Sequence, residues 1–418
     1  MSEAHPYEFC GPHLGPLAIV FGLPLVCYAL VFACNAQGCL KLSDLQLPEL
    51  PAKWQLFSSE ALLAYLGWFA LVAALHLILP GKRQEGVVLP TGARLTYKLN
   101  GFYCCVVTIS AALYFGFYTN QLYLGWIYDN YTALLAAAIL FSFGLATLLY
   151  LGSFTGNKLL AAGGNTRYGF YNFFIGRELN PRLGSFDLKE FCELYPGMIG
   201  WLLIDLGMAH KQFTQLGHVT VPMGLVCAFH AIYVLDSAWN EPAILTTMDI
   251  TSDGFGFMLV FGDLAWVPFT YTLQARYLVD HPQALSWYFI AFIIMLKALG
   301  YLMFRGANSQ KDQFRRDPEH PSVRKLQTLQ TSAGRKLIIS GWWGISRHIN
   351  YFGDWLMGWA WCLPCGFHHI IPFFYVIYFG VLLVHRERRD EHACRLKYGK
   401  DWGKYCSIVK YRIIPMLY

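Results

Sequence analysis

The stretch of the chain best equipped to bind a charged ligand runs from His385 to Tyr405, with the sequence HRERRDEHACRLKYGKDWGKY. It follows an apolar run at 370–384 and interleaves basic residues with Tyr398, Trp402 and Tyr405. Basic side chains bind phosphate oxygens, and aromatic faces stack on flat rings. A basic segment beside an apolar run also binds lipid headgroups, which is its commoner role. Lipid binding does not require the interleaved Asp390, Cys394 and aromatics, so the pattern favours a phosphorylated ligand that contains rings.

A second polar stretch, 236–263, carries acids without any Lys or Arg (DSAWNEPAILTTMDITSDGFGFMLVFGD). The simplest interpretation is a solvated loop between two apolar runs. However, the acids alternate with Trp239, Ile244, Leu245, Met248 and Ile250, so we expect the stretch to enter the protein interior. Carboxyl groups in apolar surroundings have raised pKa values and can donate protons.

A third set of residues lies at 335–354, RKLIISGWWGISRHINYFGD. An interfacial aromatic belt explains Trp342 and Trp343, but it does not explain Arg347, His348 and Asn350 in a row of polar residues before an apolar run. A Cys-x-x-Cys pair, Cys362 and Cys365, has no second ligand pair at zinc-like spacing, so no metal site is predicted. The twelve cysteines are scattered and indicate no disulfide framework.

The composition predicts an all-α polytopic membrane protein, because 56% of the 418 residues are hydrophobic and only 14% are charged. Apolar runs of spanning length lie at about 14–35, 59–80, 100–118, 131–153, 190–209, 219–236, 254–275, 285–304, 351–367 and 370–385, which gives about ten helices. The loops 81–99, 154–189 and 305–347 and the tail from 386 hold 27 of the 32 Lys and Arg residues. By the positive-inside rule these segments and both termini are cytoplasmic.

Five ionisable residues fall inside the apolar runs: Asp205, His230, Asp263, Lys297 and Asp354. Ionisable groups are costly inside a membrane, so we expect them to pair with one another in the interior of the bundle, or to snorkel in the case of Lys297. The long polar connection at 305–340 subdivides the chain. We expect residues 1–304 to form an eight-helix bundle with a pocket for an apolar ligand, and residues 305–418 to form a cytoplasmic-face region that binds a cofactor.

Five segments together resemble the sterol reductase family: LLVHRERRDEHACRLKYG at 382–399, SGWWGISRHINYFGD at 340–354, FRGANSQKDQFRRDP at 304–318, YNFFIGRELNPR at 171–182 and TTMDITSDGFGFMLVFGDLAWVPFTYTLQ at 246–274. The resemblance covers nearly the whole chain. The last segment is more similar to the delta-14 branch of the family than to the delta-7 branch. The resemblance implies a ten-helix enzyme of the endoplasmic reticulum, the inner nuclear membrane or a bacterial inner membrane, which reduces a sterol ring double bond with NADPH in sterol biosynthesis.

The resemblance also implies where the cofactor binds. The cofactor positions of the family fall on Lys311, Arg315, Ile338, Trp343, Asn350, Tyr351, Asp390, Cys394, Tyr398 and Tyr405. Arg395 is a further candidate for the phosphates, and an additional cation near the adenosine 2′-phosphate would select NADPH over NADH. One departure is Ile349, which stands where the RHPNY motif of the family has proline. Proline presets the backbone before a helix, so its loss is expected to loosen this wall of the site.

A sterol ring alkene has no carbonyl to polarise, so its reduction needs a proton first and a hydride second. Protonation makes a tertiary carbocation at carbon 14, which then accepts the hydride. Glu241 and Asp249 are the first candidates for the proton donor, followed by Asp253, with the Tyr405 hydroxyl as an alternative near the cofactor. The expected partners are a sterol from the bilayer and the lipid membrane, with no nucleic acid and no obligate protein partner.

Three other functions are compatible with these motifs. One is reduction of a different sterol double bond, such as delta-7. Another is a membrane methyltransferase that uses S-adenosylmethionine, because RHxxY followed by a helical hairpin also resembles that class. The basic tail argues against it, since adenosylmethionine requires acidic residues there. The last is a sterol-binding scaffold without catalysis.

Overall fold

The computed structural model describes residues 9–40, 56–89 and 92–418. The chain divides into two compact units, Met1–Pro282 and Gln283–Tyr418, and each is described by itself. The domain boundary predicted between residues 304 and 305 falls inside one continuous helix, α14 (Trp287–Arg316). The division into a sterol region and a cofactor region stays a prediction.

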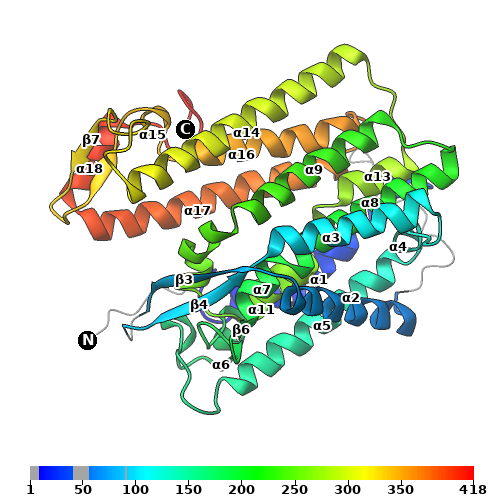
Figure 1. The fold of residues 1–418 in the computed structure, drawn as a ribbon, viewed down its shortest axis with the longest axis horizontal. Coiled ribbons are helices and arrows are strands. Elements are labelled where there is room, and N and C mark those ends of the chain that lie inside the picture. Colours follow the sequence, from blue (N-terminus) through cyan, green and yellow to red (C-terminus); the bar gives the residue numbers. More distant parts are fainter. Residues whose placement is uncertain (1–8, 41–55, 90–91) are drawn as a thin grey trace. The chain divides into compact units, whose positions relative to one another are not determined.

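The first unit is mainly helical, with three short antiparallel hairpins between its helices. In chain order it contains α1 (Leu14–Phe32), β1 (Cys34–Asn35), β2 (Gly38–Cys39), α2 (Ser59–Ile78), β3 (Lys82–Val88), β4 (Arg94–Leu99), α3 (Gly101–Leu113), η1 (Tyr114–Tyr118), α4 (Trp126–Asp129), α5 (Tyr131–Gly152), η2 (Ala162–Gly164), α6 (Gly169–Ile175), β5 (Arg182–Leu183), β6 (Phe186–Asp187), α7 (Leu188–Leu194), α8 (Pro196–Leu216), α9 (Val221–Trp239), η3 (Glu241–Thr246), α10 (Met248–Thr251), α11 (Phe257–Phe261), η4 (Gly262–Trp266), α12 (Val267–Thr270) and α13 (Leu273–Asp280) (Figure 1). Capping side chains begin several helices. Ser58, Asp187 and Thr220 each accept a backbone N–H from the first turn of α2, α7 and α9.

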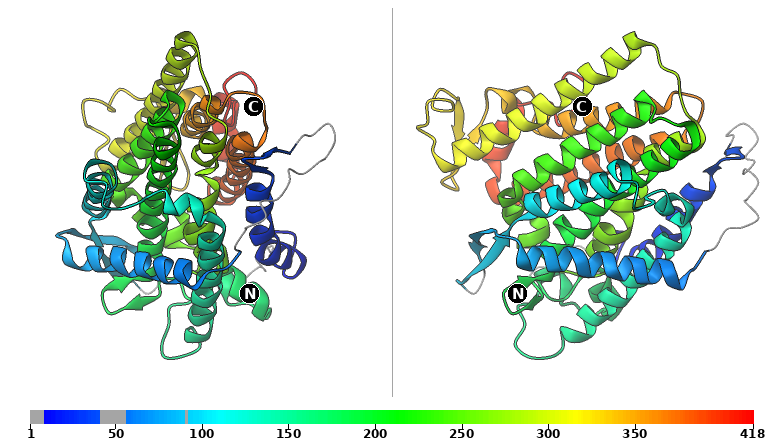
Figure 2. Two further views of the ribbon diagram at one scale, coloured as in Figure 1. Left: turned by 90° about the vertical axis from the view of Figure 1, so that its right-hand side faces the viewer. Right: turned by 45° about the vertical axis from the view of Figure 1, so that its right-hand side comes forward.

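The second unit contains α14, β7 (Thr328–Gln330), β8 (Lys336–Ile338), α15 (Trp342–Ile345), α16 (Ile349–Cys362), η5 (Leu363–Cys365), η6 (Ile371–Phe373), α17 (Phe374–Tyr398) and α18 (Lys400–Ile408). Its three long helices, α14, α16 and α17, run side by side in all views (Figure 1, Figure 2). Facing residues at both ends show that α14 and α16 are antiparallel: Gly300 meets Gly353, and Phe289 contacts Phe367 just beyond α16.

Six helices of the described residues are long and apolar enough to cross a membrane: Leu14–Phe32, Ser59–Ile78, Gly101–Tyr118, Tyr131–Gly152, Val221–Trp239 and Trp287–Arg316. The mainly helical, membrane-protein class is therefore confirmed, while a total of ten spans stays a prediction. The predicted run at 254–275 is not one helix, because it is divided among α11, the π-helix η4, α12 and α13. The run at 351–367 corresponds to α16, which has only 14 residues.

Two glycines bring α14 and α16 into backbone contact. A Cβ atom on Gly353 would lie 2.6 Å from the Phe304 backbone nitrogen and 2.7 Å from the Gly300 carbonyl oxygen. These neighbours are backbone atoms, which cannot rotate away as a side chain would. The close approach lets α14 and α16 pack along their length, and residues from both helices then meet at their polar ends.

In the first unit, a buried lysine fixes the acidic segment that follows α9. Lys189, on α7, is fully buried, and its ammonium donates to the carbonyls of Asp249, Ile250 and Asp253 at 2.6, 3.0 and 2.8 Å. Gly176, with a φ of 94°, packs directly against the backbone of Gly254–Gly256 at the other end of the segment. Burial lowers the pKa of Lys189 to about 8 although nearby carboxylates oppose this shift. The carbonyls that surround the ammonium satisfy its three donors.

Gly353→Ala is expected to destabilise the second unit, because the added methyl group collides with backbone on α14. Overpacking of this kind costs about 1–3 kcal/mol. The matched control is Gly403→Ala on α18, where an added Cβ meets nothing within 4 Å and alanine favours the helix. Thermal unfolding in detergent should show a lower Tm for Gly353→Ala only. An equal Tm for the two variants would contradict this packing.

Lys189→Met is expected to release the segment 248–253, because three buried carbonyls lose their donor, and each unsatisfied polar group costs about 1–3 kcal/mol. Hydrogen exchange should become faster in this segment. Lys158→Met is the control, since Lys158 is partly exposed, lies outside this segment and pairs with Glu178 at 3.1 Å. Unchanged exchange in Lys189→Met would mean that the carbonyls are held by something else.

Candidate functional site

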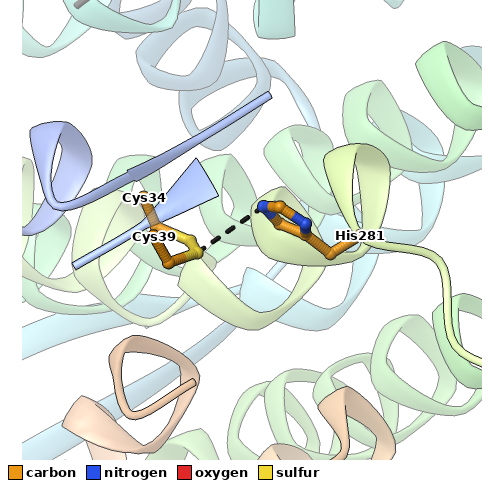
Figure 3. A group of neighbouring side chains, drawn as sticks. All are labelled: Cys34, Cys39 and His281. Atoms are coloured by element: carbon orange, nitrogen blue, oxygen red, sulfur yellow. Dashed lines mark hydrogen bonds between the residues drawn. A yellow bond between two sulfur atoms is a disulfide. The ribbon is translucent and has the colours of Figure 1, made fainter. Parts of the chain in front are cut away.

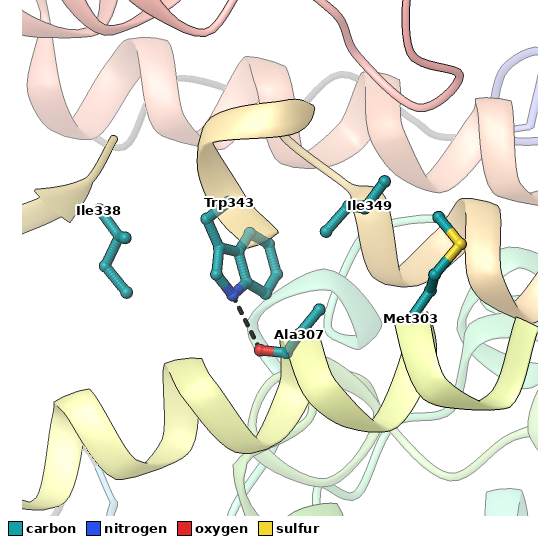
Figure 4. Close-up of a cluster of buried hydrophobic side chains, with 5 residues drawn as sticks. All are labelled: Met303, Ala307, Ile338, Trp343 and Ile349. Carbon is teal, nitrogen blue, oxygen red and sulfur yellow. Dashed lines mark hydrogen bonds between the residues drawn. The ribbon is translucent and has the colours of Figure 1, made fainter. Parts of the chain in front are cut away.

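In the second unit, a cation and an indole ring form the first wall of the candidate cofactor site. The Lys311 ammonium on α14 lies 4.1 Å from the centre of the Trp343 ring, a cation–π distance. The Trp343 N–H donates to the Ala307 carbonyl oxygen at 2.8 Å, which fixes the ring plane. Ile338 and Trp343 belong to one buried cluster with Met303, Ala307 and Ile349 (Figure 4). Three predicted cofactor residues, Lys311, Ile338 and Trp343, are thus brought together.

Ile349, the departure from the family motif, lies in the same cluster and is fully buried. Helix α16 begins at Ile349, the first helical position, where proline is favoured. The helix therefore begins here with isoleucine in place of proline. The isoleucine side chain packs in the buried cluster.

The start of α16 contributes polar groups to the site. The Asn350 side-chain nitrogen donates to Asn308 Oδ1 at 3.1 Å, while Asn350 Oδ1 is buried and has no hydrogen-bond partner in the part of the chain that the structure describes. The Tyr351 ring stacks on His348 at 4.8 Å, and His348 Nε2 lies 3.6 Å from Asp390 Oδ2. Burial, with neighbouring cations adding to it, lowers the pKa of His348 to about 3, so the imidazole is neutral at physiological pH. The unsatisfied Asn350 oxygen is an acceptor available to a ligand amide.

The end of α17 and α18 form the aromatic wall. Cys394 Sγ lies 3.8 Å from Asp390 Oδ2, one helical turn away. Trp402 stacks on Tyr398 and Tyr405, with ring centres 6.2 and 5.0 Å apart. Cys394, Tyr398 and Tyr405 share one hydrophobic cluster with Trp402 and Val409. These predicted residues come together as expected, and electrostatic interactions of Lys311 with Asp390 and Cys394 link them to the first wall.

Two predicted phosphate ligands, Arg395 and Arg315, lie at the edge of the candidate cofactor site. Arg395 bonds Glu391 at 2.7 Å, and its side chain is 67% exposed. Arg315 is exposed on the last turn of α14 and interacts electrostatically with Lys311.

Two residues near the site were not predicted from the sequence. Asn308 orients Asn350, and Arg347 bonds Glu391 at 3.1 Å. Asn308 lies about one helical turn before Lys311 on α14, and this spacing could have indicated that it faces the same site.

In the first unit, Glu241 is the best-placed predicted acid. Its side chain is buried, and it accepts the Gly101 backbone N–H at 2.9 Å and the Tyr195 hydroxyl. Burial raises the pKa of the Glu241 carboxyl, and hydrogen bonds from Tyr195, Gly101 and Asn100 reduce the shift. A carboxyl group that holds its proton more tightly than usual is suited to proton donation. Tyr195 and a second buried acid, Glu190, were not predicted.

The other predicted acids differ from Glu241. Asp249 and Asp253 are half-buried, and their backbone carbonyls hold Lys189. The expectation that the whole segment enters the interior is wrong at Trp239, which is 70% exposed at the end of α9, whereas Leu245 and Ile250 pack in a buried cluster. Tyr405 belongs to the second unit and these acids to the first, so each is described within its own unit.

The first unit also contains a buried polar pair and an apolar cavity. Asp205 Oδ2 lies 2.8 Å from His230 Nδ1, so these two of the five ionisable residues pair as predicted. A cavity of about 150 Å³ opens beside α2, α5 and α8. Its lining includes Tyr65, Trp68 and Phe269, and it is predominantly apolar.

The cysteines include one pair that the sequence did not indicate. Cys34 and Cys39 form a disulfide across the β1–β2 hairpin, with His281 Nε2 3.5 Å from Cys39 Sγ (Figure 3). The sequence indicated no disulfide framework and did not indicate this single pair, because a five-residue separation closes a hairpin only when the turn brings the strands into register. The three residues have metal-ligand character, but the two sulfurs are bonded to each other.

The comparisons with known proteins agree with the resemblance in the motifs. The family described as "Ergosterol biosynthesis ERG4/ERG24 family" matches residues 3–418. The chain is 49% identical to Delta(14)-sterol reductase erg24 of Schizosaccharomyces pombe, over 100% of this chain and 98% of that protein. It is 49% identical to Delta(14)-sterol reductase TM7SF2 of Mus musculus, over 99% and 98%. It is 47% identical to Delta(14)-sterol reductase LBR of Gallus gallus, over 99% of this chain and 65% of that protein. The chain belongs to the ERG4/ERG24 family of sterol reductases.

Proposed function

We propose that this protein reduces the 14,15 double bond of a sterol intermediate with NADPH. The observation that carries the proposal is the identity of almost one half, over the full chain, to proteins named Delta(14)-sterol reductase. The family supports a nicotinamide cofactor in general, and the choice of NADPH rests on the residues of the second unit. We also propose that the protein acts in the endoplasmic reticulum with both termini in the cytoplasm, because the basic loops cluster on one predicted side.

The residues of the second unit fit a phosphorylated nicotinamide cofactor. Lys311 and Arg315 supply cations for the phosphates, and Arg395 is an exposed cation that can meet the 2′-phosphate. The unpartnered Asn350 oxygen matches the N–H donors of a carboxamide. Asp390 accepts from a ribose hydroxyl, and the Trp343 and Tyr405 rings offer faces for stacking. When bound, NADPH supplies the hydride that converts the carbocation to the saturated ring.

The protein must also supply a proton, because the alkene carries no polar group that a cofactor can attack. Glu241 is the proposed donor, and its proton moves to carbon 15 of the sterol. Burial raises the pKa of this acid and so favours its protonated form, and the Tyr195 and Gly101 hydrogen bonds stabilise the carboxylate that remains. The fixed donors thereby stabilise the charge that develops during the proton transfer.

Purified protein with NADPH is expected to convert a delta-14 diene sterol, identified by mass spectrometry of the products. A delta-7 diene and S-adenosylmethionine serve as comparison arms. Lys311→Met should raise the KM for NADPH at least tenfold, because a charge-assisted contact contributes about 1.5–3 kcal/mol. Lys336→Met, an exposed lysine on β8, is the matched control and should leave KM unchanged. Conversion of the delta-7 diene alone, or binding of S-adenosylmethionine in place of NADPH, would contradict the proposal.

Glu241→Gln is expected to lower kcat at least a hundredfold, since loss of general-acid catalysis costs about 10²–10⁴-fold. NADPH affinity should stay unchanged, because the cofactor residues lie in the second unit. Asp249→Asn is the comparison variant. A loss confined to Asp249→Asn would move the donor role to Asp249, and full turnover in both variants would remove the role from this segment.

A further inference from the structure

The second unit contains a groove that includes none of the predicted cofactor residues. Its volume is about 640 Å³, within the range of about 300–1,000 Å³ that is typical of small-molecule sites. Trp355 and Trp359 line it from α16, and α17 lines it between Val376 and Arg388. Tyr418 closes one side. Every lining residue belongs to the second unit, so the groove is described within that unit alone.

The long wall of the groove is apolar. Trp355 donates its indole N–H to the Val376 carbonyl oxygen at 2.9 Å, so its one polar group is satisfied inside the protein. The Trp355 and Trp359 ring centres lie 5.9 Å apart. Gly380 adds depth, because a Cβ atom at this position would lie 3.1 Å from Trp355 Nε1. The wall therefore offers carbon surface to a ligand, and a hydrocarbon chain is the ligand that fits it.

One face of α17 joins this apolar wall to a cation. Four lining residues recur at helical spacing and so share that face: Ile377, Val381, Val384 and Arg388. Ile377 and Val381 are exposed although both side chains are aliphatic. From Val376 to Arg388 the helix rises about 18 Å, and the hydrocarbon of one membrane leaflet is about 15 Å deep. The groove thus matches the depth of one leaflet, with its cation at the polar end.

The Arg388 guanidinium is available to a ligand. Its side chain is exposed, and it makes no hydrogen bond or ion pair in the part of the chain that the structure describes. Two flanking acids are engaged elsewhere. Glu387 accepts from Arg412 at 3.1 Å, and Glu391 accepts from Arg347 at 3.1 Å. Because guanidinium binds phosphate through paired N–H donors, this end of the groove is complementary to a phosphate group that carries a hydrocarbon chain.

We propose that this groove binds one anionic phospholipid from the leaflet that surrounds the polar end of α17. An acyl chain lies along Trp355 and Gly380, and the phosphate binds the Arg388 guanidinium. The basic segment 385–405 then serves two ligands on two faces. Arg388 and Asp390 are two positions apart, which separates their side chains by about 200° around the helix. The cofactor residues and the lipid-binding arginine are therefore directed to different sides of α17.

Native mass spectrometry of the detergent-purified full chain tests the headgroup contact, with phosphatidylserine and phosphatidylcholine added in separate arms. The unmodified chain should retain one phosphatidylserine in preference to phosphatidylcholine. Arg388→Gln should weaken phosphatidylserine binding about tenfold, the loss expected for a charge-assisted contact. Arg388→Lys keeps the charge without the paired donors and should retain part of the binding. Arg324→Gln is the matched control, because Arg324 is an exposed arginine of the same unit outside the groove.

Two further arms identify the ligand and its position. Glycerophosphoserine, the headgroup without acyl chains, should not displace the lipid, and displacement would mean that the site binds free phosphate esters. A phosphatidylserine with a photoreactive acyl chain should label peptides that contain Trp355 or Val381, with a photoreactive sterol as the comparison. The Tm and the KM for NADPH should be equal in Arg388→Gln and Arg324→Gln. Both readouts report binding, so they do not depend on the reaction that the protein catalyses.

Three results would overturn the proposal. One is equal phosphatidylserine binding by Arg388→Gln and Arg324→Gln. Another is labelling of the groove by the sterol alone, which would make it a sterol site. The third is a raised KM for NADPH in Arg388→Gln with unchanged lipid binding, which would assign this arginine to the cofactor.

Discussion

The structure depends on one constraint: every ionisable group that enters an apolar interior must find partners within the protein. Lys189 meets it with three carbonyl oxygens, and Asp205 meets it with His230. Because a buried ammonium can be satisfied only when its acceptors converge, Lys189 determines the path of the backbone between α10 and α11. The segment that carries Asp249 and Asp253 is therefore held by a buried ammonium group. The hydrogen bonds that satisfy Lys189 therefore also fix the position of this acidic segment.

The same constraint explains how far sequence reasoning reached. The residues of the candidate cofactor site were predicted from long, contiguous motifs, and they come together where α14 and α16 pack and at the end of α17 with α18. Glu241 was predicted because an acid between apolar residues is conspicuous. Tyr195 was not predicted, since a tyrosine before the apolar start of α8 looks like an ordinary helix beginning. Its contribution to the site is a hydrogen bond to Glu241, a residue 46 positions later, which no local pattern contains.

The errors have physical causes too. Trp239 looked like part of an interior segment, but it is the last residue of α9, and its orientation is fixed by the phase of that helix. The run at 254–275 has the hydropathy of a single span. The chain stays helical from 257 to 270 through a π-helical turn, and a turn at 271–272 then separates it from α13, so the run is not one regular α-helix. Hydropathy reports which residues avoid water, and it does not report where the hydrogen-bond pattern of a helix changes.

The disulfide of the β1–β2 hairpin has a consequence for the sidedness of the protein. Arg276 and His281 donate to the carbonyls of Cys34 and Asn35, so the hairpin is fastened to the end of α13. Disulfides persist in oxidising compartments and are reduced in the cytosol. In the topology predicted from the basic loops, the end of α1 beside this hairpin faces away from the cytoplasm, and that compartment is one in which a disulfide persists.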